Sequence, residues 1–445
     1  MMDENFISGV IEGFYGQPWS RAERLQLFAW MRDGKLNTYL YAPKDDLKLR
    51  ARWRESYTRE ELDSLRELIG SAIALGIEFT YALSPGLDIT YSLPTDLRAI
   101  EARFEKMLGL GVKSFALLFD DIPDRMRPDD ARAFQSVAEA QSHVTNHIYF
   151  WLRERHAANR FYFCPTPYCG RMAEHGLGGA RYLETIGAQL QPKIQIFWTG
   201  PEIISEELPV AHIRKIGSLL RRKPVIWDNL HANDYDGRRF FVGPYSGRSR
   251  ELRDEVAGIL INPNCELPLN YVPIRTFADY LNISGIWHPR EIYLDALRAW
   301  LPQFDNISFD DLVLLCDCFY LPHHDGPEAE QLYNSLTDVV DCASLATAFP
   351  ILTKATRLRE VCARLAEMKN RPLFYALSRR IWELREELDL LEKFITFRAS
   401  PEHAPKSFHS DFHQPKTYRG GFVPRLQKLL TQNPDGSFSP SPIGK

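Results

Sequence analysis

The sequence predicts an α/β fold, namely a (β/α)8 TIM barrel followed by an all-α helical region. In the first two thirds of the chain, short apolar runs alternate with longer amphipathic segments, and the alternation repeats eight times over about 280 residues. Alternating strands and helices indicate a parallel sheet, and this length is close to that of a typical barrel. A doubly wound open sheet is the alternative, but no Gly-x-Gly-x-x-Gly sequence opens a helix after a strand. We therefore expect the barrel.

Four pairs of strand and helix are expected in the first half of the barrel. Each apolar run ends in turn-forming residues, and the segment after it has apolar residues at helical spacing. Ser20 can cap the first helix, and Thr58 begins T-R-E-E, a capping box for the second. We expect strands at Phe6–Glu12, Asn37–Ala42, Ile77–Leu83 and Phe115–Phe119, and helices at Arg21–Arg32, from Thr58 to about Leu75, around Leu97–Leu110 and at Asp129–Arg155.

The second half of the barrel repeats the pattern four more times. Polar residues gather just after each apolar run, which is where a barrel has its active-site rim. We expect strands at Arg160–Cys164, Ile194–Trp198, Pro224–Trp227 and Gly258–Ile261, and helices near Ala180–Leu190, Val210–Arg221, Glu251–Val256 and Thr276–Leu281.

The character of the chain changes at about Asn306, where strand-like runs give way to charged, amphipathic helical patterns. Ser308 can cap the first of these. Two domains are therefore expected: a catalytic barrel over residues 1–304, and a helical bundle or stalk over residues 305–445 with a frayed Pro/Ser-rich tail. Further helices are expected at Thr337–Ala348, Ile351–Met368, Leu373–Phe397 and Pro424–Thr431.

Composition limits the classes of function. The 445 residues are 44% hydrophobic and 25% charged, as in an ordinary globular protein, and the net charge of −4 gives no reason to expect nucleic acid as a partner. No apolar run is long enough for a membrane helix, and the first residues do not resemble a signal peptide. The seven cysteines are scattered and odd in number, which favours a reducing cytosol over a disulfide framework. We expect a cytoplasmic protein.

Three other features are interpreted as structural. Cys316 and Cys318 precede His323 and His324, but positions two apart in a helix do not share a face, so we expect neither a metal site nor a cofactor. His231 stands alone in a polar loop, where a structural role is the better interpretation. The basic loop Arg238–Arg250 could hold an anion, but a solvated loop is more common.

Asp120 and Asp121 follow the apolar run Phe115–Phe119. A short apolar run between breakers predicts a strand buried on both faces, and it would deliver both carboxylates to the edge where barrels have their chemistry. Neighbouring side chains on a strand point to opposite faces, so both can serve one site only if the chain turns there. Pro123 favours such an end to the strand. On its own, an Asp-Asp pair would more often be a cap beside a solvated residue.

The other residues of the rim change that balance. Amides, carboxylates, a lysine and aromatic rings are what a pyranose sugar requires, because its hydroxyl groups take polar partners and its C–H face packs on a ring. Any one of them could be a cap or turn residue, but their joint placement at one end of a barrel indicates a binding site. The candidates are Gly13, Lys44, Asp120, Asp121, Tyr168, Trp227, Asn229, Asp234 and Asn262.

Several stretches resemble glycoside hydrolase family 84, the protein O-GlcNAcase family. They are G-V-I-E-G-F-Y-G-Q-P-W, Y-L-Y-A-P-K-D-D, A-L-S-P-G-L-D-I-T, F-A-L-L-F-D-D-I, F-C-P-T-P-Y-C-G, W-T-G-P, P-V-I-W-D-N-L-H-A-N-D-Y-D and N-P-N-C-E. The match continues into the helical part with D-C-F-Y-L-P-H-H-D-G-P and Y-R-G-G-F, so it covers nearly the whole chain. The chain is similar to a short, bacterial-type homologue of the animal catalytic core, because it ends without an acetyltransferase-like domain and has no long insert between barrel and helices.

The resemblance implies removal of β-linked N-acetylglucosamine from Ser or Thr by substrate-assisted, retaining hydrolysis. Asp120 would then orient the 2-acetamido group, and Asp121 would act as the acid and base. Tyr168 would bond the developing intermediate, Trp227 would line the acetamide pocket, and Asn229 would contact the acetamide region and the Asp pair. Gly13, Lys44, Asp234 and Asn262 would hold the ring hydroxyls, with Tyr15, Tyr235 and Ile203 as weaker candidates for the aglycon side.

The resemblance also implies a homodimer through the helical region, in which the last helix, at about Val423–Thr431, crosses to the partner or folds back on its own bundle. Two other functions remain open. A β-N-acetylglucosaminidase acting on free glycans or cell-wall fragments would use the same pocket. A non-catalytic GlcNAc-binding protein would need only the sugar-holding residues, and the intact carboxylates count against it.

Overall fold

The computed structural model describes residues 5–155, 159–342, 345–399, 429–435 and 437–441. These residues form two compact units. The first comprises the described parts of Met1–Glu330 together with Leu365–Arg380, and the second comprises those of Gln331–Arg364 and Ile381–Lys445. By packing, residues 305–330 and 365–380 belong with the first unit. The domain boundary that we expect at residue 304 from the sequence stays a prediction.

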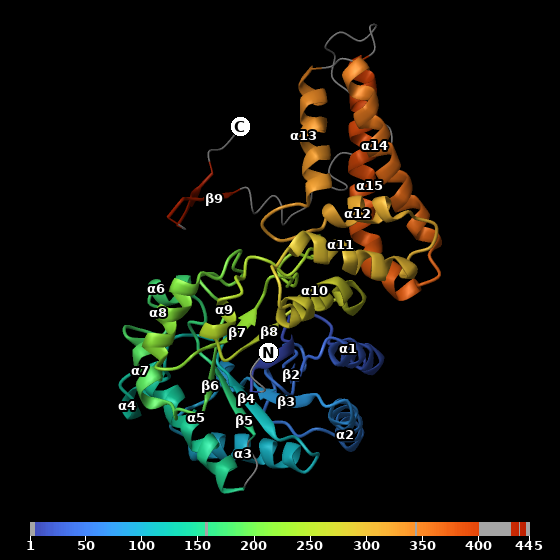
Figure 1. Cartoon of the computed structure of the whole chain (residues 1–445). Helices are drawn as coiled ribbons and strands as arrows, with labels where there is room; N and C mark the ends of the chain where they lie inside the picture. Colours follow the sequence, from blue (N-terminus) through green and yellow to red (C-terminus); the bar gives the residue numbers. More distant parts are fainter. Residues whose placement is uncertain (1–4, 156–158, 343–344, 400–428, 436, 442–445) are drawn as a thin grey trace. The chain divides into compact units, whose positions relative to one another are not determined.

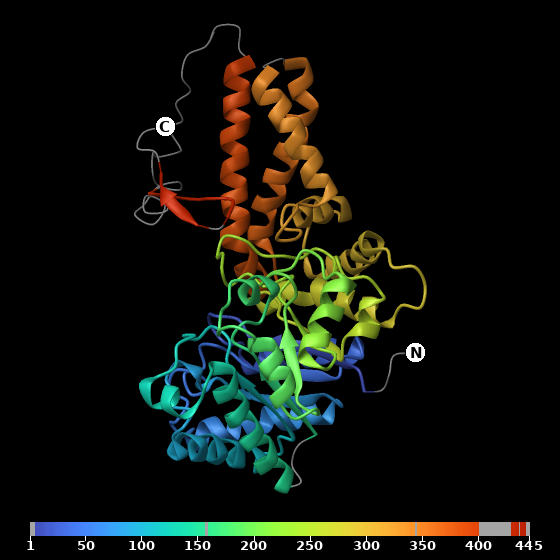
Figure 2. The ribbon, with the colours of Figure 1, turned by 90° about the vertical axis from the view of Figure 1, so that its left-hand side faces the viewer.

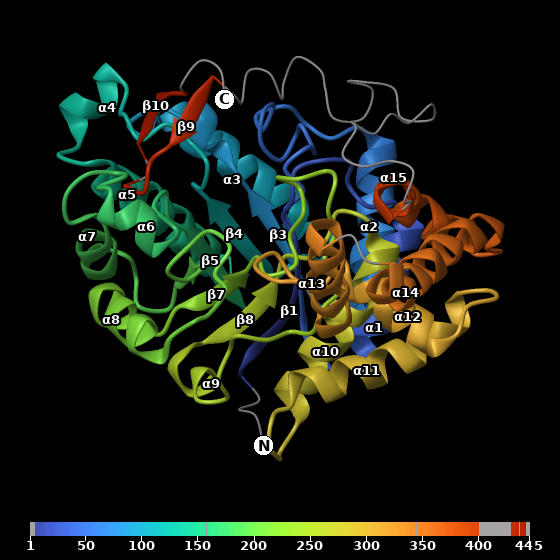
Figure 3. The same ribbon diagram turned by 90° about the horizontal axis from the view of Figure 1, so that it is seen from above.

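The first unit is a closed barrel of eight parallel strands in sequence order, which confirms the predicted fold (Figure 3). The barrel closes where β1 pairs with β8, with Ile7 opposite Gly258 and Val10 opposite Ile261. The strands are β1 Ile7–Glu12, β2 Thr38–Tyr41, β3 Glu78–Leu83, β4 Ser114–Leu118, β5 Arg160–Cys164, β6 Gln195–Trp198, β7 Val225–Asp228 and β8 Gly258–Ile261.

Helices follow the strands around the outside of the barrel, as the view from above shows (Figure 3). The predicted caps are confirmed, because Ser20 and Thr58 each form a capping box with the glutamate three residues further on. The helices are α1 Arg21–Asp33, α2 Arg59–Ala74, α3 Pro94–Leu108, α4 Pro128–Ala133, α5 Val137–Glu154, α6 Gly170–Glu174, α7 Tyr182–Gln189, α8 Val210–Leu220, α9 Leu252–Glu255 and α10 Tyr271–Asn282, with short 3₁₀ turns at Pro85–Leu87 and Leu267–Asn270.

The prediction of one helix over Asp129–Arg155 is wrong. Phe134, between α4 and α5, has an extended backbone, and Ser136 caps α5 by accepting a hydrogen bond from the Glu139 N–H. The break is not visible in the apolar pattern, because that pattern continues across it. The signal for the new helix is Ser136 three residues before Glu139, a typical helix start.

The remaining helices are α11 Pro289–Trp300, α12 Phe309–Asp317, α13 Pro327–Cys342, α14 Leu345–Arg364 and α15 Arg371–Ala399, with 3₁₀ turns at Leu301–Gln303 and Leu365–Glu367. Ser308 caps α12 as predicted. Helix α11 was not predicted. Helix α13 begins earlier than predicted, and α14 continues through Pro350, where the sequence favours a break.

In the second unit, the parts of α13, α14 and α15 that belong to it run alongside one another (Figures 1 and 2). Arg359 of α14 and Asp389 of α15 form an ion pair of 2.7 Å. The predicted helix Pro424–Thr431 is wrong at its end, because Leu430–Gln432 form strand β9, which pairs with β10, Phe438–Pro440. Residues Leu430–Gln432 form a strand because they pair with Phe438–Pro440. The local spacing of apolar residues does not reveal this pairing. Residues 424–428 lie outside the described residues.

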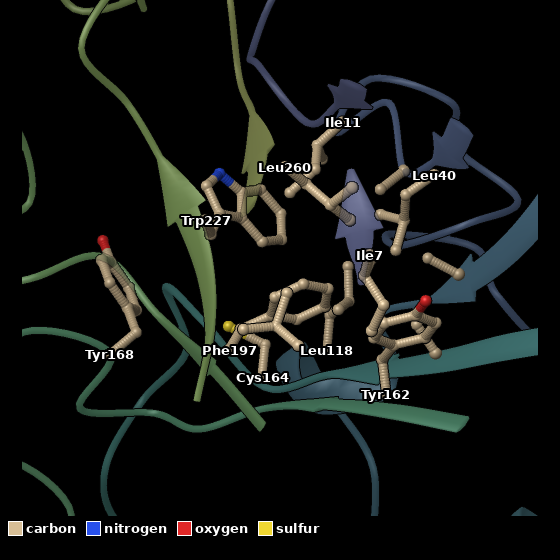
Figure 4. Close-up of a cluster of buried hydrophobic side chains, with 14 of the residues drawn as sticks. Ile7, Ile11, Leu40, Leu118, Tyr162, Cys164, Tyr168, Phe197, Trp227 and Leu260 are labelled. Atoms are coloured by element: carbon tan, nitrogen blue, oxygen red, sulfur yellow. The ribbon is translucent and has the colours of Figure 1, made fainter. Parts of the chain in front are cut away.

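The barrel interior is filled by side chains from all eight strands and the loops after them (Figure 4). The core residues on the strands have almost no exposed surface, as expected for parallel strands covered on both faces. Towards the carboxyl ends of the strands, the packing ends at Trp227, Tyr168 and Cys164, which also line a cavity. None of the helices in the described ranges is long and apolar enough to cross a bilayer.

Candidate active site

The two carboxylates lie at the carboxyl end of β4, where the chain turns. Asp120 is buried, with 5% of its surface exposed, and Asp121 has a φ of +51°, in the left-handed region that few residues other than glycine adopt. The chain thus turns just after the strand ends at Leu118, and both carboxylates line the same cavity. The turn that the sequence argument required is therefore present.

A cavity of about 820 Å³ opens at this end of the barrel. All nine candidates from the sequence line it, together with the three weaker ones, Tyr15, Ile203 and Tyr235. The structure thus brings together residues from the ends of β1, β2, β4, β5, β7 and β8 that are as much as 249 positions apart in the chain, as in the contact between Gly13 and Asn262.

Asp120 is held by one oxygen and leaves the other unused. The Lys44 Nζ donates a hydrogen bond to the Asp120 Oδ2, and the two groups form an ion pair. Both side chains are almost fully buried. The Asp120 Oδ1 is also buried but has no hydrogen-bond partner within the part of the chain that the structure describes. Because an unsatisfied buried carboxylate oxygen is costly, this atom is suited to accept a donor from a bound molecule.

Asp121 accepts two phenol hydrogen bonds. Tyr168 donates to Oδ1 at 2.7 Å, and Tyr15 donates to Oδ2 at 3.0 Å. Burial, followed by the nearby charge of Asp121, raises the pKa of both phenols far above the ordinary value. Both tyrosines therefore remain protonated donors towards this carboxylate.

A chain of amide hydrogen bonds forms another part of the cavity wall. The Asn262 Oδ1 accepts from the Gly13 N–H at 3.3 Å, and its Nδ2 donates to the Asn229 Oδ1 at 3.0 Å. Asn229 in turn donates to the Ile203 carbonyl at 2.8 Å. The Asp234 carboxylate accepts from the Tyr15 N–H at 2.9 Å, and burial raises the pKa of this carboxyl group. These polar groups converge on one space from separate loops.

The indole of Trp227 contributes apolar surface to the cavity. Phe197 contacts it edge-on (Figure 4), with ring centroids 5.4 Å apart. The Lys44 Nζ lies 5.6 Å from the centroid of the indole ring. A β-carbon on Gly13 would lie 2.4 Å from the Trp227 Cζ2, so only glycine permits this approach of backbone to indole.

Several residues of the site were not found from the sequence. Arg50 donates to both Tyr15 and Asp121, and Arg171 pairs with Glu202 at 2.8 Å on the cavity wall. His323 also lines the cavity. Arg50 and His323 lie in loops and have no local sequence signal. For Arg50 the reason is that an arginine that binds a distant carbonyl has no sequence pattern of its own.

The interpretation of Arg238–Arg250 as a solvated loop is wrong for Arg248. This residue is buried and pairs with Asp228 through two hydrogen bonds of 2.7 and 2.8 Å, and it also donates to the Ser205 carbonyl. The Tyr245 phenol completes the cluster by donating to Asp228 at 2.8 Å. The pair joins the loop to the end of β7, since Asp228 is the residue between Trp227 and Asn229.

His231 is buried, and its Nε2 lies 2.9 Å from the Gly243 carbonyl, in agreement with a structural role. Cys316 is buried within α12, and His323 and His324 lie in the loop after it. Within the described ranges, no group of three or more His, Cys, Asp or Glu side chains is placed to hold a metal ion.

A closed parallel barrel that holds two adjacent carboxylates, a lysine and an aromatic wall in one cavity is the arrangement of a glycoside hydrolase of the (β/α)8 class. The sequence profile of the β-N-acetylglucosaminidase family matches residues 8–308. The chain belongs to this family, the O-GlcNAcases of glycoside hydrolase family 84.

Individual relatives agree with this assignment. The protein O-GlcNAcases of Rattus norvegicus and Mus musculus are each 48% identical over 283 residues, which cover 63% of this chain and 31% of each relative. The chain thus spans about a third of the length of these curated relatives. A solved O-GlcNAc hydrolase mutant of Thermobaculum terrenum superposes with a TM-score of 0.80 at 31% identity, covering 89% of this chain and 85% of that one.

Proposed function

We propose that the protein removes β-linked N-acetylglucosamine from Ser and Thr of proteins, using the substrate's own 2-acetamido group as the nucleophile. The observation that carries this proposal is the buried Asp120 Oδ1, an acceptor without a protein partner in the described chain, on the wall of the cavity that also holds Asp121. The 2-acetamido group of N-acetylglucosamine has an N–H that can donate to this oxygen, and a sugar with a hydroxyl group at C2 has no such N–H.

In the first step, the acetamide oxygen attacks C1 of the sugar, and the bond from C1 to the leaving oxygen breaks. Asp120 accepts the acetamide N–H, which increases the nucleophilicity of the carbonyl oxygen and stabilises the positive charge of the oxazoline as it forms. The ion pair with Lys44 keeps the Asp120 carboxylate in place. Asp121 gives its proton to the leaving Ser or Thr oxygen.

In the second step, Asp121 takes a proton from a water that attacks C1, and the oxazoline reopens with the β configuration retained. The two phenols on Asp121 keep its oxygens oriented between these roles. Gly13, Lys44, Asp234 and Asn262 bind the hydroxyls of the sugar ring, Asn229 and Trp227 enclose the acetamide, and Tyr168 bonds the developing intermediate.

The mechanism is tested by replacing each carboxylate with asparagine. Asp121→Asn is expected to lose about 10²–10⁴-fold on a glycopeptide and much less on an activated aryl glycoside, which needs little protonation. Asp120→Asn is expected to depress both substrates, because oxazoline formation precedes either fate. Near-full activity of Asp120→Asn would rule out assistance by the acetamide.

A second candidate function is hydrolysis of free glycans, since the same cavity would accept the terminal sugar of chitobiose. The half-exposed Arg171 and Glu202 on the cavity wall offer charged partners that suit a polypeptide more than a second sugar. Comparing kcat/KM for an O-GlcNAc peptide and for chitobiose decides between them. Preference for chitobiose would reject the protein substrate.

We also infer a homodimer through the helical part of the chain. Tyr333, Phe349 and Trp382 in the second unit are 67%, 74% and 44% exposed in the single chain, and a second copy would cover such aromatic surface. Sedimentation of the full chain and of one truncated before Lys416 tests this inference. A monomeric full chain with undiminished glycopeptide activity would end it. A cytoplasmic location stays a prediction that rests on the odd, scattered cysteines.

A further inference from the structure

Asp121 has an unfavourable backbone conformation that its surroundings must maintain. A left-handed φ is unfavourable for a residue other than glycine, somewhat less so for aspartate, and such conformations persist only where neighbouring groups fix them. The Asp121 carbonyl accepts a hydrogen bond from the Arg50 Nη2 at 2.8 Å. Arg50 therefore binds the strained peptide itself and not the carboxylate.

The same guanidinium also binds the phenol that contacts the carboxylate. The Arg50 Nη1 donates to the Tyr15 hydroxyl oxygen at 2.9 Å, and that hydroxyl donates to the Asp121 Oδ2 at 3.0 Å. Arginine has only donors, so the single phenol proton of Tyr15 is directed away from Arg50 and towards Asp121. One side chain thus fixes Asp121 at two points, its carbonyl and, through Tyr15, its carboxylate.

We propose that Arg50 is a positioning residue for the acid and base Asp121. This proposal rests on the role of Asp121 in the proposed function. Arg50 is absent from the described residues that line the cavity, so it acts through Asp121 and Tyr15 and does not touch the sugar. Asp121 must face the leaving oxygen in one step and water in the next, and a carboxylate that can rotate freely would serve neither step well.

The loop that carries Arg50 is itself firmly attached. Arg50 is 6% exposed, and its guanidinium lies 5.4 Å from the centroid of the Tyr15 ring. The neighbouring Leu49 carbonyl accepts from the Ser84 N–H at 3.0 Å, at the end of β3. Arg103, from α3, donates to the Lys48 and Trp53 carbonyls on either side. The position of Asp121 is thus tied to the end of the neighbouring strand and to a helix of the barrel.

The proposal is tested with two substrates that share the sugar and an aryl aglycon but differ in leaving-group ability, phenyl and 2,4-dinitrophenyl β-N-acetylglucosaminide. The phenyl glycoside needs a well-placed acid and the dinitrophenyl glycoside does not. Arg50→Met keeps an unbranched apolar stem in place of the arginine stem and removes the guanidinium donors. We expect kcat/KM of this variant to fall about 10–100-fold on the phenyl glycoside and only a few-fold on the other.

Two further variants make the result specific. Arg222→Met is a matched control, because Arg222 also binds several backbone carbonyls but lies at the opposite end of the barrel; we expect its ratio between the substrates to equal that of the wild type. Asp121→Asn reports the acid directly. The ratio compared is kcat/KM on the dinitrophenyl glycoside divided by kcat/KM on the phenyl glycoside. If this ratio rises for Asp121→Asn but stays at the wild-type value for Arg50→Met, only the positioning role is overturned. If it stays at the wild-type value for both variants, the acid role is overturned as well.

If Arg50→Met does not yield folded protein, Arg50→Lys decides in the same assay. Lysine retains the charge but cannot donate along two parallel directions, so we expect an intermediate ratio. Coupling is a third readout, because Arg50→Lys should change the ratio less in a Tyr15→Phe background than in the wild type. A wild-type ratio for folded Arg50→Lys would reject the proposal in that case.

Discussion

Gly13 lies where the backbone after β1 contacts the Trp227 indole, and this contact gives a prediction at the scale of a single residue. In Gly13→Ala the new methyl group would meet the Trp227 Cζ2 at 2.4 Å and the Ile11 Cγ2 at 2.8 Å. We expect the indole to shift, with weaker inhibition by GlcNAc-thiazoline and a loss of about 1–3 kcal/mol in the free energy of unfolding, as is typical of overpacking.

The control for this substitution is Gly70→Ala. Gly70 is exposed within α2, and a β-carbon there meets nothing within 4 Å. Alanine is the better helix former, so this variant should gain up to about 1 kcal/mol and bind the thiazoline as the wild type does. Inhibition of Gly13→Ala equal to that of the wild type would show that the indole position does not depend on the glycine.

His231 gives a prediction about pH. Burial lowers the pKa of His231 to about 4, although its hydrogen bond to the Gly243 carbonyl opposes the shift. The unfolded chain, with an ordinary histidine pKa of about 6.5, binds more protons than the folded chain between pH 4 and 6.5. Stability therefore falls as the pH drops through this window and is unaffected by this group above it.

The size of the effect follows from the same shift. Between pH 7 and pH 5, the free energy of unfolding of the wild type should fall by about 2 kcal/mol more than that of His231→Gln, which does not titrate. Urea unfolding at both pH values measures this difference. Equal losses in the two proteins would show that His231 titrates normally in the fold.

At the scale of elements, Asp228 and Arg248 join the end of β7 to the loop after it. Burial acts to raise the pKa of Asp228, but the ion pair with Arg248 and hydrogen bonds from Tyr245 and Leu230 outweigh it, and the pKa lies below its ordinary value. Arg248→Met would leave a buried carboxylate without its cation, and we expect a loss of about 3–5 kcal/mol in the free energy of unfolding.

The companion variant distinguishes a lost ion pair from lost packing. Asp228→Asn combined with Arg248→Met removes both charges, so it should recover part of the stability that the single substitution loses. Chemical denaturation of the two proteins gives the comparison. A double variant no more stable than Arg248→Met would mean that packing of the arginine, not its charge, is what matters.

The strands were predictable from the sequence because parallel strands are covered on both faces and therefore appear as continuous apolar runs. Each of the eight barrel strands overlaps a predicted one. The break between α4 and α5 was missed because the apolar pattern continues across it, and the end of the chain was mispredicted because β9 depends on its pairing with β10.

The site was predictable to the extent that topology alone brings residues together. Gly13, Asn229 and Asn262 follow different strands, and the closed barrel places all strand ends on one rim, so their convergence needed no knowledge of side-chain contacts. Arg50 and Arg248 could not be assigned in this way, because their partners are carbonyls, a phenol and a carboxylate whose positions depend on how the loops pack.

At the scale of the whole molecule, the barrel unit is not continuous in sequence. Residues 365–380 return to it after the second unit has begun, and Arg380 pairs with Glu266 at 2.6 Å and donates to the Gly237 carbonyl at 3.1 Å. Arg380→Met should lower the free energy of unfolding by about 1.5–3 kcal/mol, because charged hydrogen bonds of a buried group are lost. Arg379→Met, at the exposed neighbouring position, should leave it unchanged.

Urea unfolding, monitored by hydrogen exchange of the β7 and β8 amides, measures the loss of stability in Arg380→Met in the part of the barrel next to its contacts. A chain that ends at Glu330 should lose at least as much stability as Arg380→Met, since it lacks the whole returning segment. If the shortened chain were as stable as the full one, the contacts of Arg380 would contribute nothing to the barrel.

The returning segment also has a consequence for the order of events during synthesis. Roughly fifty residues separate Glu330 from Arg380, and a ribosome adding about 5–20 residues per second needs about 3–10 s to make them. During that interval all eight strands have been translated, but the arginine that binds Glu266 has not. The nascent barrel therefore lacks this contact with the rim loop after β7, which carries Asp234, until α14 and the start of α15 have been made.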